Sequence, residues 1–247
     1  WIIGEDIVQT DPNSAHVVEA MNSLELLVVQ EIFMSETAKL ATVVLPGTTF
    51  LEKDGTFTNT ERRIQRVNRA VEPLPGTKPD GVIVTDMMQK LGFDQPTYDA
   101  DQVLKEIADV VPFFKGVTRE RLGKLGLQWP VQEDGTDTQI LHTETFKLGK
   151  GRLKNFDWKE STEIETNQKK YPLILTTSRV LQHYNAATMT RRTKNINIVD
   201  EDVLLIHPKD AAHRDINTGD IGRLYSGRGE VALKVEVTDK VKEGIVF

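Results

Sequence analysis

The stretch from Pro172 to Val199 has the composition of an anion-binding loop. It contains no Asp or Glu, although the 247-residue chain carries a formal net charge of -6. Its cationic side chains are Arg179, Arg191, Arg192 and Lys194. Because the planar guanidinium of arginine matches the oxygens of a phosphate, this charge pattern favours a phosphate-bearing ligand. Charge alone fits a solvated basic loop equally well.

Groups that can pair with a polar ring accompany these charges. The hydroxyl donors are Thr176, Thr177, Ser178, Thr188, Thr190 and Thr193, and Gln182, His183 and Asn185 can bond to amide-like edges of a heterocycle. The stretch follows an expected strand over residues 171–177 and then loses both helical and strand periodicity, which is typical of a binding loop on a rigid edge. The set therefore fits a large, polar, phosphorylated heterocycle.

A second candidate site lies in the first 45 residues, where short apolar strands alternate with helical stretches. Strands are expected at residues 1–3, 26–29 and 43–45, and helices at 14–23 and 35–41. This order favours a parallel sheet with flanking helices, whose ligands bind beyond the carboxyl ends of the strands. The polar residues expected near those ends are Gly4, Glu5, Asp6, Thr10, Gln30 and Glu31. Helix caps and solvated turns are the alternative for Glu5 and Asp6.

The remaining elements are predicted to pack around these sites. Helices are expected from Asp80 with Val82, Ile83, Met87 and Leu91 on one face, over 99–110 with Val103, Ile107 and Val110 on one face, and from Thr118 to about Gly126. After residue 170 the pattern changes to strands at 203–206, 221–225 and 231–237, with a short helix at 208–212. Alternating apolar residues in the last strand predict a half-buried barrel wall.

Several tracts resemble one enzyme family. The run RVLQHY at 179–184, followed by TMTR at 188–191, resembles the opening of the molybdopterin-dinucleotide-binding domain of the bis-molybdopterin guanine dinucleotide oxidoreductases, most closely the formate dehydrogenase catalytic subunits. The tracts GED at 4–6, VQEIF at 29–33, EKDGTFTNTERRIQ at 52–65 and GLQWP at 126–130 are similar to the same family. The chain departs from its pattern at Thr42, where Asp is usual, at Ser178, where Gly is usual, and at 185–187, where a His-Thr-Gly-like triplet is usual.

The resemblance implies an α/β fold, with a Rossmann-like parallel-sheet segment followed by a double-psi-type β-barrel, both expected to be incomplete. It divides the chain into the C-terminal part of an α/β domain (1–92), a helical and turn-rich connection (93–168) and the dinucleotide-binding barrel (169–247). The implied cofactor-binding residues are Gly4, Glu5, Asp6, Thr10, Gln30, Glu31, Gly55, Asn59, Arg179, Gln182, His183, Thr188, Met189, Thr190 and Arg191. For Gly55 and Asn59, a role in the turn is the alternative.

The resemblance also implies a cofactor and a reaction. The parent enzyme would hold bis-molybdopterin guanine dinucleotide with molybdenum or tungsten, would carry iron–sulfur clusters elsewhere, and would oxidise formate to carbon dioxide in a two-electron step. This chain is then expected to be a C-terminal fragment, inactive alone, that contacts the upstream part of the same subunit and possible electron-transfer subunits. A nitrate reductase or other bis-pterin enzyme, a non-catalytic structural homologue and a plain nucleotide-binding module are the alternatives.

Composition also bears on metal sites, membrane spans and the cellular compartment. With no cysteine, the chain cannot ligate a cysteine-bound cluster, and its five histidines show no metal-ligand spacing, so no metal-binding residues are expected. The resemblance implies that the catalytic residues lie in the upstream part of the subunit, so none is expected in this chain. No apolar run approaches the ~20 residues of a membrane span, and no nucleic-acid partner is expected. Because no signal peptide is visible, the cytoplasm is the expected compartment, with the periplasm as the alternative.

Overall fold

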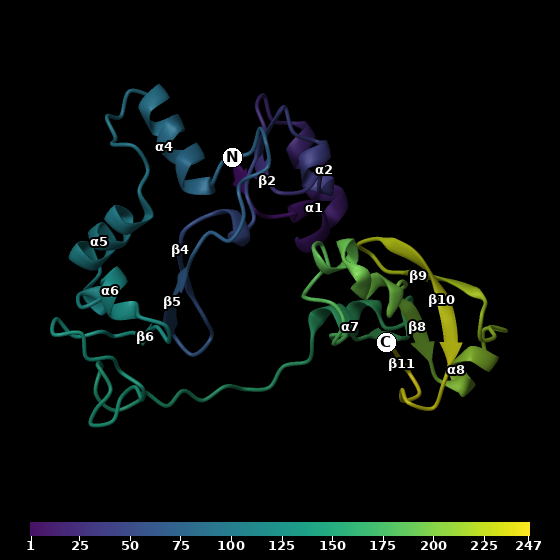
Figure 1. Ribbon diagram of the computed structural model, residues 1–247. Helices are drawn as coiled ribbons and strands as arrows, with labels where there is room; N and C mark the ends of the chain where they lie inside the picture. The colour runs from purple at the N-terminus through teal and green to yellow at the C-terminus, as the bar shows by residue number, and fades with distance from the viewer. The chain divides into compact units, whose positions relative to one another are not determined.

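The computed structural model describes residues 1–247 except for the side chains of Glu163 and Glu165. The chain divides into two compact units (Figure 1). Unit 1 comprises residues 1–5 and 25–154, and unit 2 comprises residues 6–24 and 155–247. Each unit therefore draws on two separate stretches of the sequence.

Unit 1 begins with a parallel sheet in the order β1-β2-β3. Its strands are β1 (Ile2–Ile3), β2 (Val28–Glu31) and β3 (Val43–Pro46), and α3 (Glu36–Lys39) connects the last two. Ser35 caps α3, because its hydroxyl oxygen accepts a hydrogen bond from the Ala38 amide at 3.1 Å. The predicted order of strands and helices is confirmed. β2 starts two residues later than predicted. The Leu27 carbonyl, just before β2, accepts hydrogen bonds from the amides of Thr42 and Val43.

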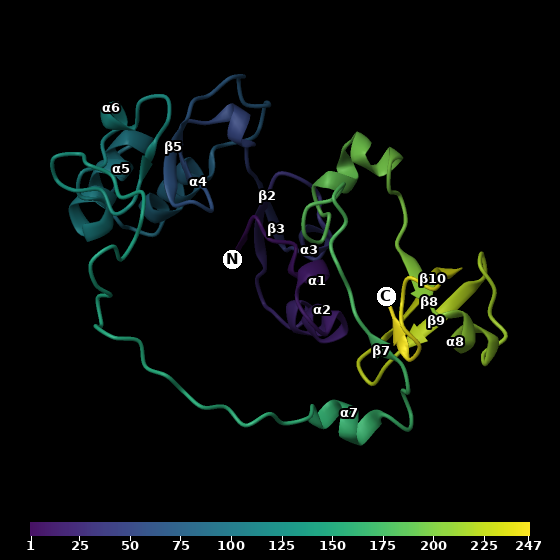
Figure 2. The same cartoon turned by 90° about the horizontal axis from the view of Figure 1, so that it is seen from below.

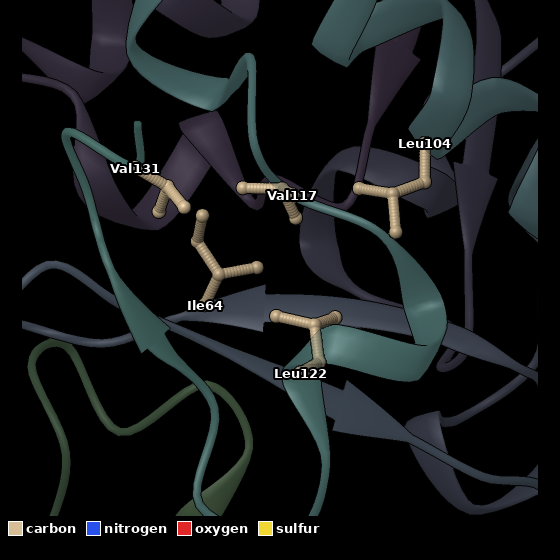
Figure 3. Close-up of a cluster of buried hydrophobic side chains, with 5 residues drawn as sticks. All are labelled: Ile64, Leu104, Val117, Leu122 and Val131. Atoms are coloured by element: carbon tan, nitrogen blue, oxygen red, sulfur yellow. The ribbon is translucent and has the colours of Figure 1, made fainter. Parts of the chain in front are cut away.

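A second, antiparallel sheet of unit 1 has the order β4-β5-β6. Its strands are β4 (Gly55–Thr58), β5 (Arg63–Val67) and β6 (Leu127–Gln128). The helical elements are η1 (Phe50–Glu52), α4 (Asp80–Lys90), α5 (Ala100–Val110), η2 (Pro112–Phe114) and α6 (Arg119–Leu122). Figure 3 shows the buried side chains that join this sheet to the helices: Ile64, Leu104, Val117, Leu122 and Val131. This cluster holds the β4–β5 hairpin in place.

The buried face of α5 differs from the prediction. Leu104 and Ala108 are buried, whereas Val103 and Val110 are 41% and 71% exposed. Leu104 packs in the cluster around Ile64, and Ala108 lies one turn further along the same stripe of the helix. The predicted face of α5 was therefore wrong by one position. α6 also ends earlier than predicted, at Leu122.

Unit 2 contains a five-stranded mixed sheet in the order β7-β11-β8-β10-β9, and Figure 2 labels β7, β8, β9 and β10 of this sheet. The strands are β7 (Ile174–Leu175), β8 (Val203–Ile206), β9 (Ile221–Tyr225), β10 (Glu230–Val237) and β11 (Ile245–Val246). β10 pairs in parallel with β8 and antiparallel with β9, and β11 pairs in parallel with β7 and antiparallel with β8. The sheet curls into a half-barrel, which confirms the predicted α/β class.

Short helices accompany this sheet. They are α1 (Ile7–Thr10), α2 (Ser14–Asn22), α7 (Thr162–Asn167) and α8 (Pro208–Ala212), with the 3-10 turns η3 (Thr190–Arg192) and η4 (Lys194–Asn197). The core of unit 2 consists of Leu204, Ile206, Ala211, Val235 and Val246. β7 is shorter than predicted, because only two of its residues pair with β11. The basic loop at 179–199 thus starts a few residues beyond β7.

Candidate functional site

The carboxyl ends of the three parallel strands meet at one edge of unit 1. The Gly4 amide donates to the Gln30 carbonyl at 2.9 Å, and the Gly47 amide donates to the Glu31 carbonyl at 3.0 Å. Gly4 has a φ of +63°, a left-handed conformation that glycine adopts without strain. The structure therefore brings Gly4, Gln30 and Glu31 together at the edge where ligands of parallel sheets bind.

A buried amide at this edge has an unused acceptor. The Gln30 side chain is 1% exposed, and its Nε2 donates to Asp80 Oδ1 at 2.7 Å. Among the described residues, Gln30 Oε1 has no hydrogen-bond partner. A buried unsatisfied acceptor costs about 1–3 kcal/mol, so a ligand donor placed here would be stabilised. Asp80 was not predicted as a site residue, because Pro79-Asp80 indicated only the start of a helix.

The ionised Asp80 side chain links the sheet edge to Lys53, which lies between η1 and β4. One carboxylate oxygen accepts from Gln30, and the other accepts from Lys53 Nζ. Burial opposes ionisation of Asp80, but the hydrogen bonds from Lys53 and Gln30 outweigh it and lower its pKa below the ordinary 3.8. The stabilising contribution of the carboxylate is present above the unfolded pKa and is lost as pH falls through the lower folded pKa.

We expect Asp80→Asn to destabilise unit 1 by about 1–2 kcal/mol at pH 7, because the substitution removes a charge-assisted bond from Lys53. The difference from the natural protein should begin to shrink as the pH falls below the ordinary value of 3.8, and it should vanish once the pH has fallen through the lower pKa of the folded carboxylate. Urea unfolding at pH 7 and at pH 3 measures both effects. The matched control is Asp86→Asn in the same helix, whose pair with Lys78 is largely exposed, so its effect should stay within about 0.5 kcal/mol. Equal losses for both variants would contradict the role of Asp80.

The three predicted acidic residues near the first strands have different surroundings. Glu31 is the last residue of β2, and its Oε1 accepts from the Ile32 amide at 2.7 Å, whereas Glu5 is exposed. Asp6 belongs to unit 2, where it is 5% exposed and precedes α1. Its carboxylate accepts from Gln9 Nε2, and its carbonyl accepts from the Thr10 amide at 3.0 Å. Asp6 and Thr10 therefore lie close together, at the two ends of the single turn of α1.

The hairpin residues have mainly structural partners. Asn59 Oδ1 accepts from the amides of Glu61 and Arg63 at 3.0 and 2.9 Å, and Asn59 Nδ2 donates to Glu61 at 3.2 Å. This geometry favours the turn role over a ligand contact for Asn59. Gly55 lines a cavity of about 220 Å³ with Phe57 and Tyr98, and a Cβ added at Gly55 would meet no atom within 4 Å. The space beside Gly55 is therefore free of protein atoms, whereas the Asn59 side chain is used in hydrogen bonds within the turn.

His183 braces the basic loop from inside. Its ring is 9% exposed, and Nε2 lies 2.7 Å from the Val199 carbonyl oxygen. Because a carbonyl only accepts, Nε2 carries the proton, and Nδ1 accepts from the Thr190 hydroxyl at 3.0 Å. The same hydroxyl oxygen accepts from the Tyr184 amide at 3.2 Å. Both ring nitrogens of His183 are therefore used within the loop, and so is the side chain of Thr190.

The two arginines that resemble family phosphate contacts differ in their partners. Arg191 donates to Asp202 Oδ2 at 2.9 Å and to the Asp200 carbonyl at 3.1 Å. Arg179 is exposed and, among the described residues, makes no hydrogen bond or ion pair. An unpaired guanidinium on a braced loop is available to an anion. The charge of Arg179 is therefore available to an anion, whereas Arg191 would have to release Asp202 before it could pair with one.

The other predicted residues of this loop use their backbones for internal contacts. The Gln182 carbonyl accepts from Asn195 Nδ2 at 2.7 Å, and the Thr188 carbonyl accepts from Arg192 Nε at 3.1 Å. The side chain of Met189 is 54% exposed. The contacts of Gln182 and Thr188 involve carbonyl oxygens, which leaves their side chains open to a ligand.

Ala187 stands at a backbone position that suits glycine. It is 5% exposed and has a φ of +62°. We expect Ala187→Gly to raise stability by up to about 1 kcal/mol, because the left-handed conformation strains a residue with a Cβ. The control is Ala186→Gly, which has an exposed side chain and no positive φ and should lose about 0.4–1 kcal/mol. Thermal unfolding compares them, and a loss for both variants would show that the strain at Ala187 is negligible.

Two classes of feature are absent from the described residues. No group of three or more His, Cys, Asp or Glu side chains among them could hold a metal ion. None of the helices formed by the same residues has the length and apolar character needed to cross a bilayer. The donors present, guanidinium, hydroxyl, amide and backbone N–H, fit the phosphates and base of a dinucleotide rather than a metal.

Two family models match this arrangement. Residues 1–90 match "Molybdopterin oxidoreductase", and residues 173–247 match "Molydopterin dinucleotide binding domain". The first range covers the parallel sheet with Gln30 and Asp80, and the second covers the basic loop and the half-barrel. The chain belongs to the molybdopterin oxidoreductase family, a family of enzymes.

Curated relatives agree with this assignment. The chain is 42% identical, over its full length, to the "F420-dependent formate dehydrogenase subunit alpha" of Methanocaldococcus jannaschii and covers 37% of that protein. It is 41% identical to the "Probable oxidoreductase YjgC" of Bacillus subtilis, again over the full chain and 25% of the relative. A putative formate dehydrogenase of Staphylococcus aureus is 40% identical over 98% of the chain and 25% of its own length. The chain thus spans well under half of these relatives.

A solved structure shares the fold. The acetylene hydratase of Pelobacter acetylenicus superimposes with a TM-score of 0.69 over 95% of this chain and 34% of the hydratase, at 21% sequence identity. At that identity the likeness concerns the fold alone. The mixed α/β fold described above, with its parallel sheet and its curled sheet, is therefore shared with that hydratase.

Proposed function

We propose that this chain binds the dinucleotide ends of a molybdopterin cofactor in a formate dehydrogenase. The observation that carries the proposal is the unpaired guanidinium of Arg179 on a loop that His183 and Thr190 brace. The 42% identity to a formate dehydrogenase alpha subunit supports formate as the substrate of the whole enzyme. The proposed division into residues 1–92, 93–168 and 169–247 assigns this loop to the third part.

Each unit contributes its own groups to the proposed binding. In unit 2, Arg179 would contact a phosphate, with Gln182, Thr188 and Arg191 nearby in sequence. In unit 1, Gln30 Oε1 and the Asp80 carboxylate would accept from amino and ring N–H groups of a base such as guanine. The remaining proposed contacts are Gly4, Glu5, Asp6, Thr10, Glu31, Gly55, Met189 and the backbone of Thr190.

The chemistry of the reaction belongs to the cofactor. When bound, a molybdenum or tungsten centre would supply the two-electron step, and this chain would orient the dinucleotides and exclude water from them. Iron–sulfur clusters and electron-transfer subunits would lie outside residues 1–247, and a cytoplasmic location is part of the same proposal. The residues described above bind and position, and none of them is proposed to transfer a proton or an electron.

The proposal is tested on the full-length protein and on residues 1–247 alone. The full-length protein should contain molybdenum or tungsten and reduce a viologen dye in the presence of formate. Residues 1–247 alone should show neither property, because no described side-chain group could hold the metal. Nitrate reduction without formate oxidation would indicate another bis-pterin enzyme. Tight binding of GMP by a full-length protein that lacks pterin would instead indicate a nucleotide-binding module.

A further inference from the structure

Two tracts that resemble the family separately, at 52–65 and 126–130, are joined in the structure by one side chain. Arg62 lies in the turn between β4 and β5. Its Nη1 donates to the carbonyls of Trp129 and Thr138, and its Nη2 donates to the carbonyls of Thr138 and Gln139, at 3.1 and 2.9 Å. A single guanidinium thus satisfies three main-chain carbonyls from residues that are distant in the sequence.

An aromatic ring and further hydrogen bonds lie beside the Arg62 guanidinium. Its central carbon lies 5.7 Å from the centre of the Trp129 ring, within the range of a cation–π contact. The Trp129 amide donates to the Arg62 carbonyl at 3.1 Å, and Gln128 Nε2 donates to the Glu61 carbonyl at 3.0 Å. Main-chain and side-chain bonds therefore fasten residues 128–139 to the hairpin at the same place.

The backbone at Arg62 has a disfavoured left-handed conformation, and the hydrogen bonds of its side chain help to hold it. Arg62 has a φ of +67°, where glycine or asparagine is favoured and other residues pay about 1 kcal/mol or more. Such strain persists where the surroundings determine the conformation. Lysine could supply the charge, but its ammonium lacks the planar fork that reaches several carbonyls at once. Glycine would remove the strain and leave the carbonyls without donors.

We propose that Arg62 is a positioning residue whose guanidinium fills a three-carbonyl site formed by Trp129, Thr138 and Gln139. By filling it, Arg62 holds the β4–β5 hairpin and residues 128–139 as one body. It thereby fixes the point from which the irregular segment at 140–161 begins. Once the side chain is removed, the same site should accept a free guanidinium ion. This role does not depend on which cofactor the enzyme binds.

The test uses Arg62→Asn, which removes the guanidinium but tolerates the left-handed backbone. The reporters are two amides in the anchored segment: that of Trp129, bonded to Arg62, and that of Thr138, bonded to the Gln128 carbonyl at 3.0 Å. Their hydrogen exchange should accelerate about ten- to a hundredfold, the loss expected for bonds to a charged group. Millimolar guanidinium chloride should restore much of the protection, whereas urea or sodium chloride should not.

Matched variants keep this test decisive. Arg66→Asn makes the same change on β5, where the Arg66 side chain donates to Asn68 at 3.2 Å, and should leave both reporter amides unchanged. Arg62→Lys covers the case in which Arg62→Asn does not fold. It should show intermediate protection that guanidinium does not improve, because the lysine occupies the site. Unchanged exchange in Arg62→Asn, equal rescue by urea, or full protection in Arg62→Lys would each overturn the proposal.

Discussion

Replacing Arg179 with alanine in the full-length protein will lower retention of the dinucleotide cofactor about ten- to a hundredfold. The reason is that the Arg179 guanidinium has no partner among the described residues, so its charge is available to a phosphate. A hydrogen bond to a charged group contributes about 1.5–3 kcal/mol, which sets this range. Pterin released from the purified protein by denaturation, measured per mole of protein, reports retention.

The control for Arg179 is an arginine with similar exposure and no proposed ligand. Arg152→Ala lies in the irregular segment at 140–161 and should leave cofactor content unchanged. Folding of Arg179→Ala should also match that of the natural protein within about 0.5 kcal/mol, because the side chain is exposed. If Arg179→Ala retained full cofactor, the basic loop would be a solvated surface, as its charge alone allows.

Replacing His183 with alanine will destabilise the basic loop even in the absence of cofactor, by roughly 2–3 kcal/mol. The substitution leaves the Val199 carbonyl without its donor and deprives the Thr190 hydroxyl of its acceptor. Urea unfolding of the cofactor-free chain measures the loss, and proteolysis within residues 179–199 localises it. The exposed His213 provides the control, since His213→Ala should change stability by no more than about 0.5 kcal/mol.

The His183 experiment separates two roles. The sequence indicated an imidazole that contacts a ligand, whereas the structure uses both ring nitrogens inside the loop. A variant that keeps its cofactor-free stability but loses cofactor would favour direct contact. A variant that loses stability before any cofactor is added would favour a structural role, in which His183 stabilises the loop through its internal hydrogen bonds.

The sequence predicted the order of elements better than the pairing of side chains. The alternation of strands and helices placed Glu31 at the end of β2, where the structure has it. The sequence did not predict that Asp202 pairs with Arg191. Asp202 lies outside the basic stretch, and it reaches Arg191 only because of the way the loop folds back. Asp80 was missed for a similar reason, since its contact with Gln30 joins residues far apart in the chain.

For α5, the start of the helix was predicted more reliably than its buried face. For α5 the start at Asp99 was clear, because a carboxylate caps the amides of Asp101 and Gln102. Several apolar positions of this helix could have faced the core. Leu104 is buried because it packs in a cluster with Ile64 and Val117, which come from other parts of the chain. Helical periodicity alone does not show which face of a helix meets such partners.

The position of β11 in the curled sheet has a consequence for biosynthesis. β11 lies between β7 and β8, and Ile245 pairs with Ile174 while Val246 pairs with Ile206. During synthesis, β11 can therefore join β7 to β8 only after Val246 has left the ribosomal exit tunnel. Until that point, the loop that carries Arg179 is attached to an incomplete sheet. Such distant pairing folds slowly, so the nascent loop is exposed to proteases and chaperones for longer than the parallel sheet of unit 1.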